Sequence, residues 1–252
     1  MTGLRFLQRA LLLAITAIAI FAPPSRAQKA GDGFLFQVPS GSWTFRTGIA
    51  IPTAHSDVFG QITDQLTLDR SDFSSATIGT TLAISLSTRN DIVFDVSYSN
   101  VNRASEFRDW VDNNDQPIQQ STSLRRIPVT IGFRHYITAR GHSLGRYAWI
   151  PAPRSLYAGV AAGMMEYKFY QQGDFVDFET LNVFADRFVS QSWTPVAQGT
   201  LGLDMGLGSF TMLNLEARYT WAQAPMSSDF VGFDHIDLSG VSVTAGLAFR
   251  LF

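Results

Sequence analysis

Residues 126–134 read Arg-Ile-Pro-Val-Thr-Ile-Gly-Phe-Arg, and this stretch decides the fold. Its apolar side chains fall on every second position: Ile127, Val129, Ile131 and Phe133. The positions between them hold arginine, proline, threonine and glycine. Strict alternation over about 4–8 residues is the pattern of a β-strand with two unlike faces. The stretch therefore predicts a strand with one apolar face and one mixed, partly charged face.

The same alternation recurs in seven other segments, which are residues 43–51, 76–87, 92–99, 156–164, 200–207, 213–221 and 241–251. Strands that cross a bilayer at a tilt need about 9–11 residues. The connections 88–91 and 207–210 are short, whereas 52–74, 100–122, 171–193 and 222–237 are long. Outer-membrane barrels have short periplasmic turns and long external loops. The connection 138–155 departs from this scheme, because it is long where a periplasmic turn is expected.

The composition excludes several classes of protein. The chain has 252 residues, of which 46% are hydrophobic and 16% charged, whereas a soluble domain has about 25% charged residues. There is no cysteine, which excludes disulfides, thiolate metal sites and thiol catalysis. The net charge of −2 gives no support for nucleic-acid binding, which requires a basic surface. We expect neither a nucleic-acid partner nor a cofactor.

The N-terminal residues have the pattern of a secretory signal peptide. Arg5 and Arg9 precede the apolar run 10–22, and the small residues Ser25 and Ala27 occupy the −3 and −1 positions of a cleavage site after Ala27. We therefore predict a signal peptide over 1–27, a periplasmic segment over 28–40 and a barrel domain with long external loops over 41–252.

The alternating strands fit two architectures, a soluble sandwich or barrel with an apolar interior and a membrane barrel with an apolar exterior. The mixed face favours the membrane barrel, because its small residues are accompanied by ionisable ones: Arg46, Asp95, Arg134, Asp204, Glu216, Arg218 and Arg250. The even strand number supports the same choice. We predict an all-β fold, an eight-stranded antiparallel up-and-down transmembrane β-barrel in the outer membrane of a diderm bacterium. Aromatic residues near segment ends, among them Trp43, Tyr157, Tyr167, Phe169 and Trp193, predict girdles at the lipid boundaries.

The seven ionisable residues of the mixed face form the strongest candidate site. An eight-stranded barrel has an interior just wide enough for side chains, and unpaired charges there are costly. We expect a network of ion pairs that fills the interior, with Asp95 as the partner of Arg134. The alternative is a charged constriction in a pore.

The long connections carry acidic and aromatic residues side by side: Asp174, Phe175, Asp177, Phe178, Asp229, Phe230, Phe233 and Asp234. Oxygen-rich clusters can hold Ca²⁺, but these lack the spacing of a calcium loop. The alternative is a packed cap over the barrel mouth. We expect no metal site, and we expect the connection with Asp174 and Asp177 to face the exterior.

Catalysis finds little support in the sequence. The four histidines are His55, His135, His142 and His235, and a lipid hydrolase would need one of them beside a serine. No recognisable spacing of nucleophile and base occurs. We therefore expect that the protein is not an enzyme.

The stretches 126–134, 156–163 (Leu-Tyr-Ala-Gly-Val-Ala-Ala-Gly), 215–219 (Leu-Glu-Ala-Arg-Tyr) and 246–252 (Gly-Leu-Ala-Phe-Arg-Leu-Phe) carry a resemblance. The chain resembles the small outer-membrane β-barrel superfamily of OmpA-like and OmpW-like type, from about residue 41 onward. The resemblance implies recognition by the barrel-assembly machinery through the strand that ends at Phe252. It departs from the family pattern because Phe249, the preceding aromatic residue, lies three positions before Phe252 instead of two.

These observations predict an integral outer-membrane protein with a structural or surface-interaction role. Outer-membrane lipid and lipopolysaccharide are the expected partners, and no external ligand is identified. The first alternative is a narrow channel for small or apolar solutes, and the less favoured one is a lipid-modifying enzyme.

Overall fold

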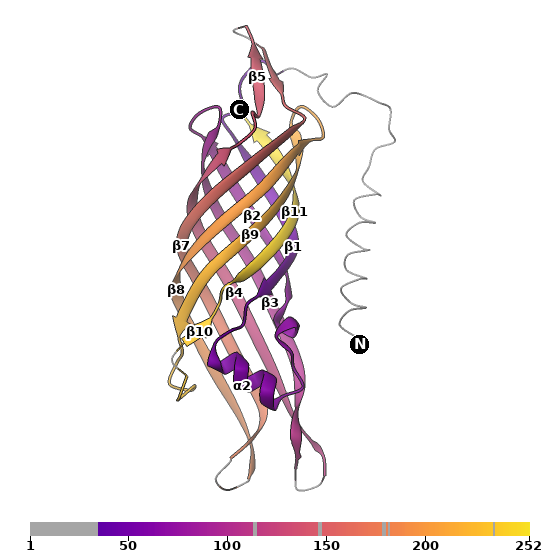
Figure 1. Cartoon of the computed structure of the whole chain (residues 1–252), viewed down its shortest axis with the longest axis vertical. Helices are drawn as coiled ribbons and strands as arrows, with labels where there is room; N and C mark the ends of the chain where they lie inside the picture. The colour runs from indigo at the N-terminus through magenta and orange to yellow at the C-terminus, as the bar shows by residue number, and fades with distance from the viewer. Residues whose placement is uncertain (1–34, 113–114, 146–147, 178–179, 181, 234) are drawn as a thin grey trace, which may run out of the picture.

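The computed structural model describes residues 35–112, 115–145, 148–177, 180, 182–233 and 235–252. Eight antiparallel strands close into a ring, as Figure 1 shows. They are β1 (Gly41–Pro52), β2 (Ser75–Ser85), β3 (Asn90–Val111), β4 (Pro117–Tyr136), β7 (Arg154–Val176), β8 (Val183–Gly206), β9 (Thr211–Pro225) and β11 (Gly240–Leu251). The ring closes where β1 pairs with β11, so the predicted barrel is confirmed. The predicted signal peptide lies outside the described residues.

Smaller elements occupy the two ends of the barrel. At the end with the long loops lie α2 (Asp57–Gln65), the 3₁₀ helix η1 (Arg70–Phe73) and β10 (His235–Asp237), which pairs with β9. At the end with the short turns, β5 (Gly141–Leu144) and β6 (Ala148–Pro151) form a separate hairpin. This hairpin accounts for the long connection 138–155. Its Trp149 also forms a β-bridge to Leu35.

Four neighbouring strands are much longer than the other four. β3, β4, β7 and β8 have 22, 20, 23 and 24 residues, whereas β1, β2, β9 and β11 have 12, 11, 15 and 12. The long strands extend past the rim at the long-loop end (Figure 1). We call this extension the overhang; it comprises residues 100–111, 117–125, 168–176 and 183–191.

The overhang corrects the prediction that 100–122 and 171–193 are loops. Alternation continues there with its polarity reversed. In β3 the outward positions change from Phe94, Val96 and Tyr98 to Asn100 and Asn102, and the inward positions change from Asp95 to the apolar Val101 and Phe107. The reversal has a physical reason, because these strands have left the lipid and enclose a core of their own.

The outside of the ring between the two ends is apolar. Large side chains there remain exposed, for example Ile131 (53%), Val160 (67%), Leu201 (61%) and Val243 (57%). Soluble proteins rarely expose a continuous apolar surface of this kind. Trp43, Trp193 and Trp221 are exposed with this band. The predicted girdle was wrong for Tyr157, Tyr167 and Phe169, whose side chains point inward and are fully buried.

The apolar core of the protein sits at the long-loop end, inside the overhang. The helix α2 contributes Val58, Phe59 and Ile62, which share one face because they are three or four positions apart or adjacent. The other large members come from η1, from the long strands and from the 226–239 connection: Phe73, Phe107, Ile118, Tyr167, Phe169, Phe230, Ile236 and Leu238. Among the described residues, no helix has the length and apolarity that crossing a lipid bilayer requires.

Candidate functional site

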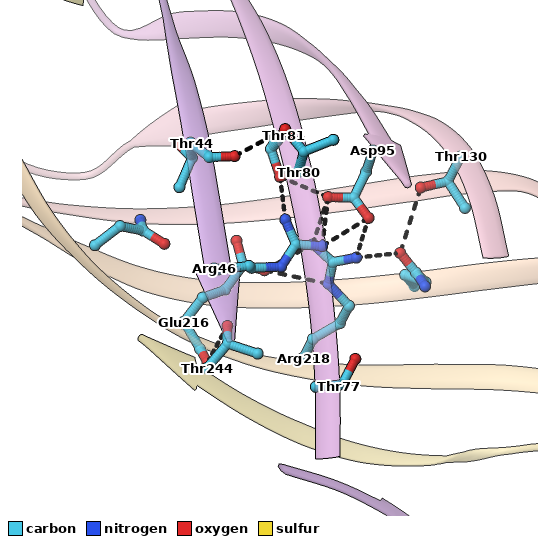
Figure 2. A network of polar contacts seen from close by, with 12 residues as sticks. Thr44, Arg46, Thr77, Thr80, Thr81, Asp95, Thr130, Glu216, Arg218 and Thr244 are labelled. Carbon is cyan, nitrogen blue, oxygen red and sulfur yellow. Dashed lines mark hydrogen bonds and ion pairs between the residues drawn. The ribbon is translucent and has the colours of Figure 1, made fainter. Parts of the chain in front are cut away.

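The inward-facing charges meet halfway along the barrel. Arg46 on β1 reaches Asp95 on β3, with 2.6 Å between Nη2 and Oδ2. Arg218 on β9 reaches the same carboxylate from across the lumen, with 2.6 Å between Nη1 and Oδ1. Its Nη2 also lies 2.7 Å from Glu216 Oε1. We call these four residues the ionic layer; Figure 2 shows two guanidinium groups converging on one carboxylate.

Neutral side chains complete the ionic layer. Thr81 donates its hydroxyl to Asp95 Oδ2 at 2.5 Å and accepts a bond from Arg46. On the other side, Gln198 accepts a bond of 3.0 Å from Arg218 and lies 3.4 Å from the Thr130 hydroxyl. All these groups are buried. Every charge therefore has a partner of opposite sign, which is the condition for placing charges in a low-dielectric interior.

A second group of polar residues lies toward the short turns. The Arg134 guanidinium stacks 4.2 Å above the Tyr157 ring and lies 3.8 Å from Glu216. The Tyr157 hydroxyl donates to Glu216 at 2.9 Å, and Asn214 donates to Tyr157 at 2.9 Å. Asp204 accepts bonds of 2.7 Å from Asn214 and 2.9 Å from Tyr136.

The predicted pairing of Arg134 with Asp95 is wrong. In the β3–β4 register Arg134 lies opposite Asp91, and Asp95 lies opposite Thr130. Four positions along a strand separate the two levels by about 13 Å. Arg250, also predicted to join the network, instead donates to the carbonyls of Gly208 and Ser209 at 3.0 and 2.6 Å. All seven predicted residues are buried inside the barrel, and the five other than Asp204 and Arg250 form ion pairs.

Several lumen residues escaped the sequence reasoning. Asp91 pairs with Arg140 at 2.9 Å, but the sequence placed Asp91 in a turn and Arg140 in an unassigned connection. Tyr136 and Tyr157 escaped because tyrosine is common at lipid boundaries as well as inside. The sequence places Arg126 on the mixed face of its strand. This inward position is the signal that could have added Arg126 to the predicted ionisable residues of the interior.

Two small cavities flank the ionic layer, and each has a volume of about 40 Å³. One is at the short-turn end, between Tyr136, Arg140, Trp149 and Arg250. The other, which we call the polar chamber, lies between the ionic layer and the apolar core and is lined by residues of all eight barrel strands. Each has room for only a few water molecules.

The acidic and aromatic residues of the long connections fulfil structural roles. Asp174 and Phe175 belong to β7, and the Phe175 ring packs 4.7 Å from Phe188. The Asp177 carboxylate accepts a bond of 2.7 Å from the Thr180 hydroxyl, and Asp229 accepts one of 3.0 Å from the Val189 N–H.

Phe230 is buried in the apolar core, and Phe233 packs against it. These contacts agree with the packed-cap alternative. Phe178 and Asp234 lie outside the described residues. In the described part of the chain, no three His, Asp or Glu side chains gather closely enough to hold a metal ion.

Asp237 links the barrel to the cap, by which we mean α2, η1 and the 226–239 connection over the long-loop end. Its carboxylate accepts a bond from the Thr53 hydroxyl, one of 3.2 Å from the His55 N–H and one of 2.9 Å from the Ser239 N–H. Burial alone would raise the pKa of Asp237, but these hydrogen bonds outweigh it and hold the pKa below its usual value. The contacts join the start of the 53–74 connection to the segment that precedes β11.

None of the histidines forms a catalytic pair within the described residues. Among the described residues, the imidazole of His135 forms a hydrogen bond, with 2.8 Å between its Nδ1 and Asn90 Oδ1. Ser56, next to His55, uses its hydroxyl to accept a bond of 3.1 Å from the Asp237 N–H. His142 and His235 are exposed.

A closed eight-stranded antiparallel barrel with an apolar exterior and a paired, charged interior is the architecture of integral outer-membrane β-barrel proteins. Within this class, the fold is similar to OprG from Pseudomonas aeruginosa, with 14% identity over 86% of this chain and 99% of that chain and a TM-score of 0.47.

It is also similar to Neisserial surface protein A, with 8% identity, 88% and 99% coverage and a TM-score of 0.42. A third solved structure is Ail, the attachment invasion locus protein of Yersinia pestis, with 14% identity, 84% and 99% coverage and a TM-score of 0.39. No protein-family model and no curated protein matches the chain.

Proposed function

We propose that this protein is a non-conducting outer-membrane barrel that acts through the surface of its overhang, in a structural or surface-interaction role. The observation that carries the proposal is the sequence of layers across the lumen. A solute would have to pass both the ionic layer and the apolar core, whose Phe59, Phe169 and Leu238 are completely buried. Displacing paired charges from one and packed rings from the other is expensive.

The overhang supplies the surface for interaction. Its outward side combines amides and hydroxyls with charged and aromatic groups, and Arg187 lies 5.1 Å above the Tyr170 ring. The overhang would face the exterior, because the opposite end has the short turns that outer-membrane barrels keep on the periplasmic side.

Lipopolysaccharide is the partner that the overhang fits best. Arg125 and Lys168 lie directly opposite each other on β4 and β7, one level beyond Trp193 of the apolar band. The Nη2 atom of Arg125 lies 2.8 Å from Glu166 Oε1, so Lys168 adds a second cation beside this ion pair. Cations just outside the aromatic level match the height of phosphates on the outer leaflet.

The remaining expectations belong to the same proposal. We propose that the barrel-assembly machinery recognises the strand that ends at Phe252, whose ring packs 5.6 Å from Phe210. We also propose that the protein has no enzymatic activity, in line with the histidine contacts. Mass spectrometry of outer-membrane lipids from cells with and without the protein should give identical profiles; a modified lipid would favour the enzyme alternative.

Planar-bilayer recording tests the closed lumen. The purified protein should give no conductance above the lipid baseline at either polarity, with a general porin as the positive control. Steady ohmic conductance of the native protein would contradict the proposal and favour the narrow channel. Liposome uptake of a small apolar solute, measured in parallel, tests the apolar-solute form of that channel.

The lipopolysaccharide contact has a matched control. Lys168→Gln removes one cation from the overhang, and Arg154→Gln removes one exposed cation from the short-turn end. Bound lipopolysaccharide raises the unfolding temperature of a protein that it binds in the folded state. We expect this rise to shrink several-fold in Lys168→Gln and to persist in Arg154→Gln. Equal responses of the two variants would exclude Lys168 as a contact.

A further inference from the structure

The polar chamber is rich in hydrogen-bond donors and contains no acid. Its charged lining residues are Arg126 and Arg218, and no Asp or Glu is among the described residues that line it. The hydroxyls of Ser97, Ser99 and Ser242 also line it, and none of the three takes part in a hydrogen bond with another described residue. The lining of the chamber therefore offers guanidinium N–H donors and free hydroxyl groups.

Arg126 is the unusual residue of the chamber. Its side chain is buried, with 6% exposure, and its protein partner is the Leu238 carbonyl at 3.3 Å. A guanidinium has five N–H donors and no acceptor. The Nε and Nη2 atoms of Arg126 have no acceptor on the described part of the chain, and neither is among the fully buried atoms without a partner, so both retain access to the space of the chamber.

Neighbouring carboxylates do not meet this need. Asp95 and Glu216 are engaged by Arg46 and Arg218 within the ionic layer. Asp237 attracts Arg126 at longer range, but its oxygens accept bonds from Thr53, His55 and Ser239. No ion pair of 4.0 Å or less includes Arg126 among the described residues.

We propose that the polar chamber binds a small monovalent inorganic anion of the halide class, with the Arg126 guanidinium as its principal ligand. An anion would accept hydrogen bonds from Arg126 and from Ser97, Ser99 or Ser242, and it would neutralise a charge that no side chain pairs. The small volume admits a halide and excludes organic anions with several carbon atoms. This site goes beyond the proposed function, because a closed lumen does not require it.

Crystallography with bromide tests occupancy directly. Crystals of the native refolded protein grown in sodium bromide should show an anomalous peak within hydrogen-bond distance of the Arg126 guanidinium. Water alone in the chamber, without anomalous signal, would overturn the proposal. The same measurement on Arg126→Lys should give a weaker peak at a shifted position.

Unfolding in solution tests whether the site binds at moderate concentration. At constant ionic strength, replacing gluconate by chloride or bromide should raise the urea midpoint of the native protein, because a ligand of the folded state stabilises it. Arg126→Met should abolish this halide-dependent shift.

The matched control is Arg125→Met, which alters the adjacent arginine on the outward face and should leave the shift intact. If Arg126→Met does not refold, Ser99→Val provides a second variant with a reduced shift. A bromide peak without any halide-dependent shift would mean binding at crystal concentration only and would overturn the proposal. Loss of the shift in both arginine variants would assign it to the outer surface and overturn it as well.

Discussion

At the scale of single residues, Asp95 is the carboxylate that two lumen arginines share, since it pairs with Arg46 and Arg218 and accepts a bond from Thr81. Asp95→Ala leaves two buried guanidinium groups without their shared partner. We expect the free energy of unfolding to fall by about 3–5 kcal/mol, measured by reversible urea unfolding in lipid vesicles.

Double-mutant cycles separate this pairing from the one that the sequence suggested. Arg46→Ala and Asp95→Ala should be strongly coupled, whereas Arg134→Ala and Asp95→Ala should be coupled clearly more weakly, because Glu216 and Arg218 separate these two residues. The half-buried pair of Arg125 and Glu166 outside the lumen is the control, with a weaker expected coupling of about 1 kcal/mol. Coupling of Arg134 to Asp95 as strong as that of Arg46 would refute the described network.

Asp237 gives the cap a dependence on pH. Its pKa is lower in the folded protein than the usual value of about 3.9 for an unfolded chain. The stabilisation is therefore complete above about pH 3.9 and is lost as the pH falls through the lowered folded pKa. Hydrogen exchange of residues 53–73, corrected for intrinsic rates, should show this loss of protection on acidification. Asp237→Asn should lack this pH response, and an identical profile in both proteins would remove Asp237 as the cause.

At the scale of elements, Phe59 is the largest of the three side chains that α2 places in the apolar core. Phe59 is fully buried and packs against Phe73 and Phe169 with centroids 4.8 and 5.9 Å apart. We expect Phe59→Ala to cost about 3–5 kcal/mol of local stability and to raise hydrogen exchange across residues 57–73. Gln61→Ala, on the exposed side of the same helix, should stay within about 0.5 kcal/mol. If exchange rose equally in β1 and β11, the cap and the barrel would unfold as one unit.

The strands of the barrel wall could be predicted from the sequence, but their full length could not. Within the lipid the outward residues are apolar, as at Ile127, Val129 and Ile131, and a period of two then identifies the strand. Beyond the lipid the same strands carry Ser121 and Ser123 outward and Leu124 inward. A period of two does not state which face meets water, so the sequence alone does not distinguish the overhang from a polar loop.

At the scale of the whole molecule, the orientation in the membrane is open to direct test. A cysteine at Gly173 is unsuitable, because this glycine has a φ of +140° and a Cβ would lie 2.3 Å from the Gln119 carbonyl oxygen. Ala185 is exposed in the same hairpin, and Leu144 is exposed at the opposite end. On intact cells an impermeant maleimide should label Ala185→Cys and spare Leu144→Cys. The reverse pattern would invert the topology; the native chain contributes no background because it lacks cysteine.

The candidate site was predictable as a set of residues and not as a set of pairs. Inward parity along each strand identified Arg46, Asp95 and Arg218 correctly. Pairing across the lumen depends on the stagger of strands and on the closure of the ring, neither of which alternation encodes. The contact of β1 with β11 brings Arg46 and the β9 residues together although they are far apart in the chain. The neutral partner Asn214 could not be predicted for the same reason.

The unequal strand lengths have a consequence for how this protein meets its neighbours. The four long strands are adjacent, so one half of the barrel circumference carries the overhang. The other half ends lower, and α2 lies beyond its rim (Figure 1). A sugar chain or protein that approaches from the side of the short strands reaches α2 and the turn at Phe230. One that approaches from the opposite side meets the outer face of the overhang. The molecule is therefore asymmetric within the plane of the membrane, and its lateral contacts depend on its rotation about the membrane normal.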